Sequence, residues 1–226
     1  MDEEEFIATF NQRMHAHRLW QHLFLVEIQR NPTYAMLQQW AVQAGKIDEV
    51  FAEILQNMLS NPSLPLAMRP PLEKNLDDER GNGNPSAEHF TLFRNVLSLI
   101  GVSEQKYREI PMTYGTSRII TSLRKASRGD DLVHILSLMA SEESICPKEF
   151  PPFLAALSQY GSATQLTYFP VHIEADALHA QDLIRMCYSA AQGRIDGISR
   201  IFTYQQEDLT NNVLFYDALM NTTRDR

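Results

Sequence analysis

Three polar side chains that can bind metals share one face of the segment YFPVHIEADALHAQDL, residues 168–183. At the rotation of about 100° per residue of an α-helix, Asp176 lies about 40° from His172, and His179 lies about 20° from it on the other side. Glu174 points away from this sector. Buried titratable groups are costly unless they meet a metal or one another. Two imidazoles and one carboxylate therefore indicate either a divalent transition-metal site or a structural hydrogen-bond network.

A further carboxylate belongs to an apolar stripe of the preceding segment, DDLVHILSLMASEESICPKEF. Leu132, Leu136 and Met139 mark this stripe, and Glu143 continues it one turn later. Glu142 continues the adjoining apolar stripe. A carboxylate in a dry core is costly without a cation. Helical periodicity alone does not choose between these two glutamates.

A carboxylate and a histidine flank the clearest loop of the chain, RGNGNPS. Glu79 ends one expected helix and His89 opens the next, so the loop can turn both toward one interior point. The competing interpretation makes His89 an ordinary residue at a helix N-terminus, with Glu88 or Glu79 as its electrostatic partner.

The three segments together supply three carboxylates and three histidines. This set has the number and softness of ligands that suit two iron ions bridged by a carboxylate, with positions left open for dioxygen. It contains no thiolate, so a closed structural zinc site is not indicated. The candidate ligands are Glu79, His89, Glu143, His172, Asp176 and His179.

Helical periodicity dominates the elements that must position these residues. Asn31 is the expected cap of the second helix, Pro147 and two further prolines are expected to bend the sixth, and Pro170 to kink or restart the seventh. A short helix is also expected in the connector 101–112. Residues 1–226 are interpreted as a single all-α domain of seven or eight long helices. The expected helices cover residues 3–29, 32–58, 66–79, 86–100, 113–125, 131–159, 164–191 and 196–219.

The composition is that of an ordinary globular protein, with 44% hydrophobic and 21% charged residues among 226. The formal net charge of −8 and the lack of a Lys/Arg stripe argue against nucleic acid as a partner. No apolar run approaches the roughly 18 residues of a membrane span. The acidic start MDEEEF is unlike a signal peptide, and Cys146 and Cys187 make no zinc spacing, so a cytoplasmic chain with reduced thiols is expected.

The motifs resemble those of the heme-oxygenase-like diiron oxidases and oxygenases. The family pattern is a Glu–His pair across a loop, a lone Glu about one turn before a Pro, and then HxxxDxxH. Here these are Glu79 with His89, the glutamate before Pro147 in EESICP, and HIEADALH. The match covers residues 75–183, and the Glu-x-x-x-Pro spacing favours Glu143 over Glu142 as the ligand.

The resemblance implies a seven-helix heme-oxygenase-like fold and a diferrous site that takes dioxygen as co-substrate. Relatives use such a site for alkene formation, for N-oxygenation of arginine derivatives, for nitrile formation from a brominated tryptophan, and for a self-sacrificing aminobenzoate synthesis. The last reaction needs a tyrosine after an N-terminal HxF motif. In this chain the stretch is QHLFLVE, and Leu25 occupies the position of that tyrosine.

Three other readings fit parts of the sequence. A metal-free hydrolase of the same fold, similar to thiaminase II, would use Cys146 or Cys187 as a nucleophile. A true heme oxygenase would use a first-helix histidine, for which the candidates are His15, His17 and His22. A non-enzymatic helical adaptor has no coiled-coil heptad or exposed apolar stripe to support it.

The substrate pocket is expected beside the iron, lined by the first two helices and the helix at residues 113–125. Glu27, Arg118 and Lys125 could hold the ammonium and carboxylate of an amino acid. An amino-acid-like substrate is therefore favoured, with nitrile formation from a tryptophan derivative or oxidative C–C or C–N cleavage as the reaction. Fatty acid decarboxylation to an alkene is the alternative. The prediction leaves room for a homodimer.

Overall fold

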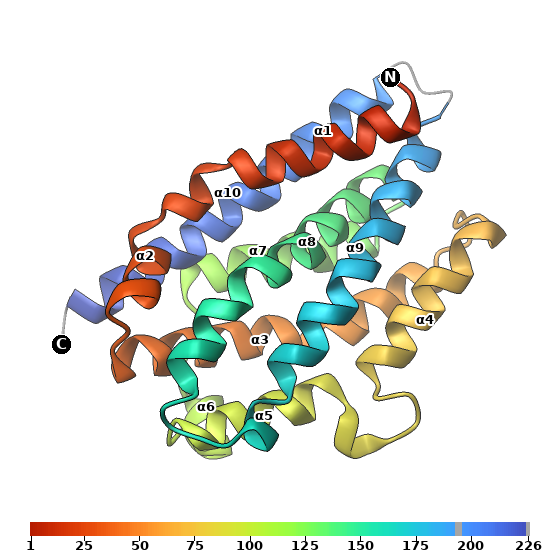
Figure 1. Ribbon diagram of the computed structural model, residues 1–226. Coiled ribbons are helices and arrows are strands. Elements are labelled where there is room, and N and C mark those ends of the chain that lie inside the picture. Colours follow the sequence, from red (N-terminus) through yellow and green to blue (C-terminus); the bar gives the residue numbers. More distant parts are fainter. Residues whose placement is uncertain (193–195, 225–226) are drawn as a thin grey trace.

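The computed structural model describes residues 1–192 and 196–224, and these contain α-helices and short 3-10 helices but no strand. This confirms the all-α fold class, with ten α-helices in the described residues rather than seven or eight (Figure 1). Their bounds are α1 Glu3–Ala16, α2 Leu23–Arg30, α3 Tyr34–Leu59, α4 Arg69–Glu79, α5 His89–Leu99, α6 Glu104–Glu109, α7 Tyr114–Ser127, α8 Leu132–Leu157, α9 Tyr168–Ala191 and α10 Gly197–Arg224.

The long helices pack around one hydrophobic core that draws side chains from α1 through to α10. Helix α8 lies along α9, and α10 packs against both α7 and α8 (Figure 1). Trp40 of α3 stacks on Phe153 of α8 with ring centroids 4.0 Å apart, and it also stacks on Phe169 of α9. These aromatic contacts fix the mutual positions of three helices beside the candidate site.

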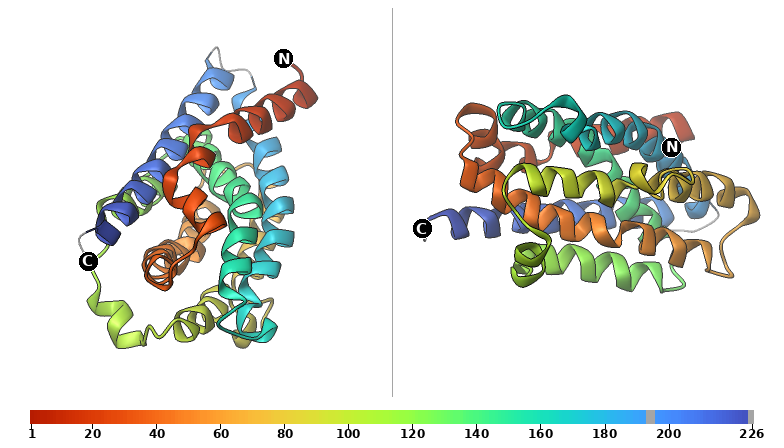
Figure 2. Two further views of the ribbon diagram at one scale, coloured as in Figure 1. Left: turned by 60° about the vertical axis from the view of Figure 1, so that its left-hand side comes forward. Right: turned by 90° about the horizontal axis from the view of Figure 1, so that it is seen from below.

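The expected single helix over residues 3–29 is wrong, because two histidines end it early. His17 and His22 have extended backbones, and the Nδ1 atom of each accepts a hydrogen bond from the N–H two residues later. Both act as N-caps, the first of a 3-10 turn at Arg18–Gln21 and the second of α2. The chain therefore changes direction between α1 and α2 (Figure 2).

Two of the expected helix starts are also shifted. Thr33 caps α3, not Asn31, because its side chain accepts the N–H of Met36. Helix α5 begins at His89, behind a 3-10 turn at Pro85–Ala87 that Asn84 caps. His89 thereby becomes the first residue of its helix.

The prolines lie within α8 and at the start of α9, and the expected restart of the seventh helix near Pro170 is confirmed. Pro147, Pro151 and Pro152 all lie inside α8, which is α-helical from Leu132 to Leu157. Pro170 lies in the first turn of α9, where a missing N–H costs little. A separate 3-10 turn at Ala163–Leu166 precedes that helix.

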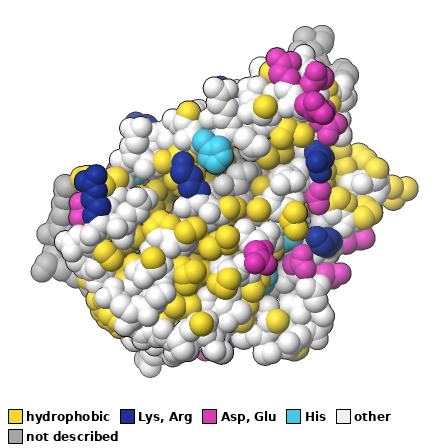
Figure 3. Space-filling model, viewed as in Figure 1, with side chains coloured by type: hydrophobic (Ala, Val, Ile, Leu, Met, Phe, Trp, Pro, Cys, Tyr) yellow, Lys and Arg dark blue, Asp and Glu magenta, His cyan; other side chains and the backbone are white. Residues whose placement is uncertain are grey.

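The exterior reflects the acidic composition. Figure 3 shows acidic side chains gathered at the beginning of α1, whose first turn holds Glu3, Glu4 and Glu5. Acidic groups at a helix N-terminus interact favourably with the helix dipole. Among the described residues, every helix is too short or too polar to cross a bilayer.

Candidate metal centre

Six buried side chains gather where α4, α5, α8 and α9 meet. They form two groups of three, and within each group one potential ligand atom per residue lies within 4.8 Å of the others. All six side chains proposed from the sequence are thus brought together, and none is more than 5% exposed. The first group is Glu79, His89 and His172, and the second is Glu143, Asp176 and His179.

A tight loop brings Glu79 and His89 together. Gly81, Asn82 and Gly83 all have positive φ angles of 73°, 51° and 82°. A Cβ atom on Gly81 would lie 2.4 Å from the carbonyl oxygen of Asn84, so only glycine fits there. The chain reverses across this loop, and Nδ1 of His89 comes to 3.1 Å from Oε1 of Glu79.

Helix α9 carries the other two histidines and the aspartate on its buried face. The ring of His172 lies against that of His89, with centroids 4.2 Å apart. Nδ1 of His172 lies 2.8 Å from the carbonyl oxygen of Tyr168 and donates to it, which leaves Nε2 as the atom with a free lone pair. This backbone bond fixes the tautomer and the ring orientation that metal binding requires.

The neighbouring glutamates of α8 face different surroundings. Oε1 of Glu143 accepts a bond of 2.7 Å from Nδ2 of Asn75, and its Oε2 lies 3.6 Å from Nδ1 of His179. Oε1 of Glu142 instead accepts a bond of 2.9 Å from Nδ2 of Asn212 on α10. Glu143 therefore belongs to the second group and Glu142 does not.

Several polar atoms around the two groups have no hydrogen-bond partner in the described structure. A buried polar atom without a partner costs about 1–3 kcal/mol. A pair of cations beside the two groups would satisfy most of these atoms at once, so the donor set fits divalent metal ions. The atoms are Nδ1 of His179, Oδ1 of Asp176, Oδ1 of Asn75 and Oδ2 of Asp48.

The pKa values of the candidate ligands are shifted because several carboxylates are buried close together without a cation. Burial raises the pKa of Asp176 well above its usual value, and the nearby Glu143 and Glu79 raise it further. Burial lowers the pKa of His172 well below 6.5. Although burial alone would lower it, the carboxylates of Glu143 and Asp78 raise the pKa of His179 to about 9. A divalent cation would relieve the repulsion among the carboxylates and would favour neutral histidines.

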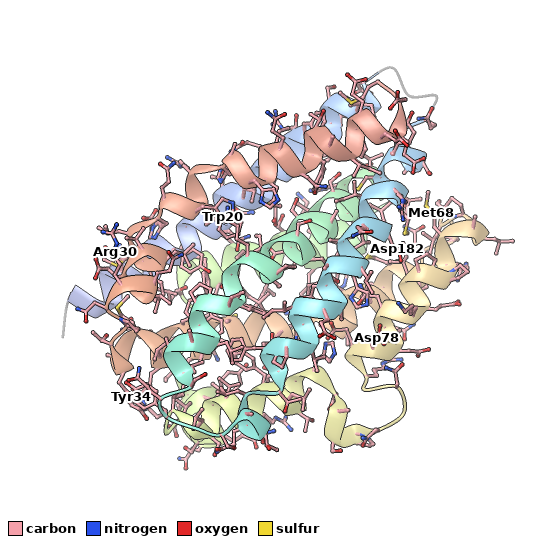
Figure 4. All side chains as sticks on the ribbon, viewed as in Figure 1. Trp20, Arg30, Tyr34, Met68, Asp78 and Asp182 are labelled. Carbon is pink, nitrogen blue, oxygen red and sulfur yellow. The ribbon has the colours of Figure 1, made fainter. Side chains whose placement is uncertain are left out.

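Asp78 orients His179 from outside the two groups. Its Oδ2 lies 3.0 Å from Nε2 of His179, so Nε2–H donates to Asp78 and Nδ1 is left facing Glu143 and Asp176. Figure 4 shows Asp78 on α4 at the side that faces α9. Such carboxylate–histidine contacts fix the ligand's tautomer and increase its basicity.

We expect Asp78→Asn to weaken metal binding at the second group by about 10–100-fold, because the orienting carboxylate is lost. Competition with a chromophoric chelator measures this affinity. Asp77→Asn is the matched control, since Asp77 is the preceding residue on α4 and is exposed. Equal affinities in Asp78→Asn and Asp77→Asn would show that Asp78 does not orient the ligand.

A cavity of about 80 Å³ adjoins the groups on the inner side. Carboxylates and aromatic residues from α3, α8, α9 and α10 line it, and its wall includes Glu79, Glu143, His172 and Asp176. A larger surface groove of about 670 Å³ reaches the groups from the other side, where His89 and His179 form part of its wall. The candidate ligands therefore separate an inner chamber from an outer groove.

The structure does not bring the proposed substrate-binding charges to the inner cavity. Glu27, Arg118 and Lys125 are not among its lining residues. Arg118 and Lys125 are exposed on α7, and Arg118 donates to Oδ1 of Asn211. Their helix is amphipathic, and both residues lie on its outer side.

The histidines proposed for a heme oxygenase and the cysteine proposed for a thiaminase-like hydrolase do not form alternative active sites. His17 and His22 cap helices and bond to Gln206 and Asp217, while His15 is exposed. Cys146 does line the inner cavity, but burial raises the pKa of its thiol well above 9. A protonated thiol is a poor nucleophile, so the cavity does not favour thiaminase-like chemistry.

Sequence reasoning missed Asp48, which lines the cavity from α3. Its Oδ1 accepts the hydroxyl of Tyr168 at 2.8 Å and lies 3.8 Å from Nε2 of His172. Asp48 follows Ala44 and precedes Phe51 on one helical stripe. A carboxylate within an apolar stripe is the same signal that identified Glu143, and it could have found Asp48.

Glu149 is a second carboxylate of the cavity wall that the sequence did not single out. Its Oε1 accepts bonds from Nε1 of Trp40, at 3.0 Å, and from the hydroxyl of Tyr216. Burial nevertheless raises its pKa from 4.5 to about 7. The folded protein thus holds this proton more tightly than the unfolded chain between pH 4.5 and pH 7.

Because the pKa of Glu149 is higher in the folded than in the unfolded protein, the free energy of unfolding of the metal-free protein should fall as pH rises from about 4.5 to about 7. The expected decrease is about 3 kcal/mol. Glu149→Gln should remove this part of the decline. Urea unfolding at pH 5 and pH 8, after chelation of metals, measures it. Glu174→Gln, which alters an exposed glutamate of α9, should change the difference little. If Glu149→Gln and the wild type lose equal stability, Glu149 is ionised at both pH values.

Comparison with known sequences finds similarity to an iron-containing family. A family model described as iron-containing redox enzyme matches residues 38–201. A curated relative, 4-aminobenzoate synthase from Chlamydia pneumoniae, is 27% identical over 154 residues, which are 67% of this chain and 66% of the relative. The matched part is thus just under two thirds of that relative's length.

Solved structures share the fold across almost the whole chain. A protein of unknown function with a heme oxygenase-like fold, from Shewanella denitrificans, has a TM-score of 0.79 at 14% identity and covers 99% of this chain and 94% of its own. A CADD-like protein from Nostoc punctiforme has a TM-score of 0.74 at 13% identity, covering 97% and 95%. A TenA homolog from Pseudomonas syringae has a TM-score of 0.72 at 12% identity, covering 96% and 92%. These likenesses show the heme-oxygenase-like fold.

Proposed function

Because this chain belongs to the family of iron-containing redox enzymes, we propose that it is a non-heme diiron oxygenase or oxidase. Its reaction consumes dioxygen and oxidises a small organic substrate. The observation that carries the proposal is the pair of buried three-ligand groups beside one cavity. A heme oxygenase would need one histidine facing a flat pocket, and the histidines near α1 do not reach this cavity.

Each group would hold one iron ion. Glu79, His89 and His172 form the first set of ligands, and Glu143, Asp176 and His179 form the second. Two histidines and one carboxylate, or two carboxylates and one histidine, suit ferrous iron and leave coordination positions open. Bound iron would supply the electrons and the Lewis acidity with which dioxygen is activated.

The rest of the chain positions these ligands and shields them from water. The carbonyl of Tyr168 orients His172, and Asn75 holds Glu143. Apolar side chains that include Phe51 and Phe150 form part of the cavity wall. Apolar groups beside a reactive centre limit the access of water and so reduce side reactions.

We propose an amino-acid-like substrate, with oxidative C–C or C–N cleavage as the candidate reaction, since a tryptophan derivative would exceed the cavity of about 80 Å³. The acidic cavity wall supports an amine-bearing substrate over the alternative, a fatty acid for decarboxylation. The aminobenzoate synthase relative supports the enzyme class. Self-sacrifice of a tyrosine at residue 25 is not proposed, because Leu25 stands there and is buried in the core.

Anaerobic titration of the metal-free protein with Fe(II) should saturate near two equivalents per chain. The reason is that the six ligand atoms fall into two separate groups. The loaded protein should then consume dioxygen when an amino acid panel is supplied. Saturation at one equivalent, or hemin binding without uptake of free iron, would contradict the diiron assignment.

A further inference from the structure

The inner cavity carries more negative groups than two metal ions need. Six carboxylates line it, and no Lys or Arg is among its lining residues. Three of them, Glu79, Glu143 and Asp176, belong to the candidate metal groups. The other three form what we call the acidic wall, which consists of Asp48, Glu142 and Glu149.

The acidic wall is held in place by neutral donors. Nδ2 of Asn212 bonds to Glu142, and Trp40 and Tyr216 bond to one oxygen of Glu149. The residues of this network come from α3, α8 and α10, so three helices fix the wall. Hydrogen bonds from these neutral groups orient Glu142 and Glu149, and Glu142 also shares a hydrogen bond with Asp208 of α10.

Asp48, the third residue of the acidic wall, lacks one hydrogen-bond partner among the described residues. Its side chain is 9% exposed, and its Oδ1 accepts the hydroxyl of Tyr168. Its Oδ2 is buried, has no hydrogen-bond partner in the described structure, and belongs to a residue that lines the cavity. A donor located in the cavity would satisfy this atom.

From this arrangement we propose that the cavity recognises its substrate through a cationic nitrogen, which the acidic wall binds. The substrate class is then small primary amines and small amino acids. An ammonium group offers three N–H donors and one positive charge, which suits three carboxylates around one cavity. The inference rests on the proposed function only in taking this cavity as the substrate site.

The size and lining of the cavity set the rest of the substrate. A volume of about 80 Å³ has room for only a few non-hydrogen atoms, at about 10–15 Å³ for each water-sized occupant. Ile47, Phe51 and Phe215 give the lining an apolar part, so the nitrogen should be attached to a short hydrocarbon body. A long fatty acid does not find enough room in a cavity of this volume.

The test compares three ligands of one size with different charge. Isothermal titration calorimetry under anaerobic conditions would measure n-butylamine, butan-1-ol and butanoate against the Fe(II)-loaded and the metal-free protein. We expect butylamine to bind at least about tenfold more tightly than the other two ligands in both forms of the protein. Neither butan-1-ol nor butanoate can make the charge-assisted hydrogen bond that an ammonium group makes with a carboxylate. Equal or tighter binding of butanoate or butan-1-ol would overturn the proposal.

Two variants then locate the site. Glu142→Gln and Glu149→Gln should each weaken butylamine binding about tenfold or more, whereas Glu174→Gln on the exposed face of α9 should not. If both wall variants bind butylamine like the wild type, the amine occupies the metal ligands and the proposal is wrong. Should either variant fail to fold, the ligand series on the wild type still decides.

The outcomes separate this inference from the diiron assignment. Amine binding that depends on the wall, together with an iron stoichiometry other than two, would refute the diiron site and keep the amine site. Two bound irons with no preference for the amine would keep the diiron site and refute the amine site.

Discussion

His172→Ala and His179→Ala should each reduce iron binding from two equivalents to about one and abolish dioxygen-dependent activity. His172 belongs to the first three-ligand group and His179 to the second, so each change removes one ligand from a different group. Loss of a direct ligand should exceed the about 10–100-fold effect of losing an orienting residue. Anaerobic Fe(II) titration of both variants measures the loss.

The fold should survive both substitutions. The two histidines contribute to a polar cluster inside a large apolar core, and the helices around it are held by contacts such as Trp40 on Phe153. Removing one member of a crowded buried cluster can be neutral or stabilising when no metal is bound. Circular dichroism should therefore keep its helical signal. Collapse of that signal in either variant would favour a structural hydrogen-bond network in place of a metal site.

The helical class and the candidate ligands could be predicted because both depend on local spacing. His172, Asp176 and His179 share one face of α9 on the periodicity of a helix alone. The loop at Gly81 marked the reversal that joins Glu79 to His89, since adjacent glycines and asparagines favour positive φ angles. Local patterns of this kind need no knowledge of which helices are neighbours.

Features that depend on distant parts of the chain could not be predicted. Asp78 reaches His179 only because α4 lies beside α9, and Glu142 reaches Asn212 only because α10 packs against α8. The same limit explains why Arg118 was proposed for the cavity, although it lies on the outer side of α7. The break between α1 and α2 was missed for a local reason, because histidine is an uncommon N-cap.

The matched pair Glu143→Gln and Glu142→Gln should separate metal binding from substrate binding on adjacent residues. Each change removes one buried negative charge and keeps the shape of the side chain, so their general electrostatic effects are similar. Glu143 lies beside His179 and Asp176, whereas Glu142 faces Asn212 across the cavity. Glu143→Gln should therefore lose at least one iron, and Glu142→Gln should keep both.

The amine affinities should change in the opposite order. Glu142→Gln should weaken butylamine binding, while Glu143→Gln should leave the acidic wall intact, because Asp48, Glu142 and Glu149 are unaltered. Iron stoichiometry and butylamine calorimetry on the same two preparations measure both effects. If Glu142→Gln loses iron and Glu143→Gln keeps it, the side chain of residue 142 turns toward the metals when they bind. The two faces of α8 would then exchange their roles, and the metal ligand would be shifted by one residue along the helix.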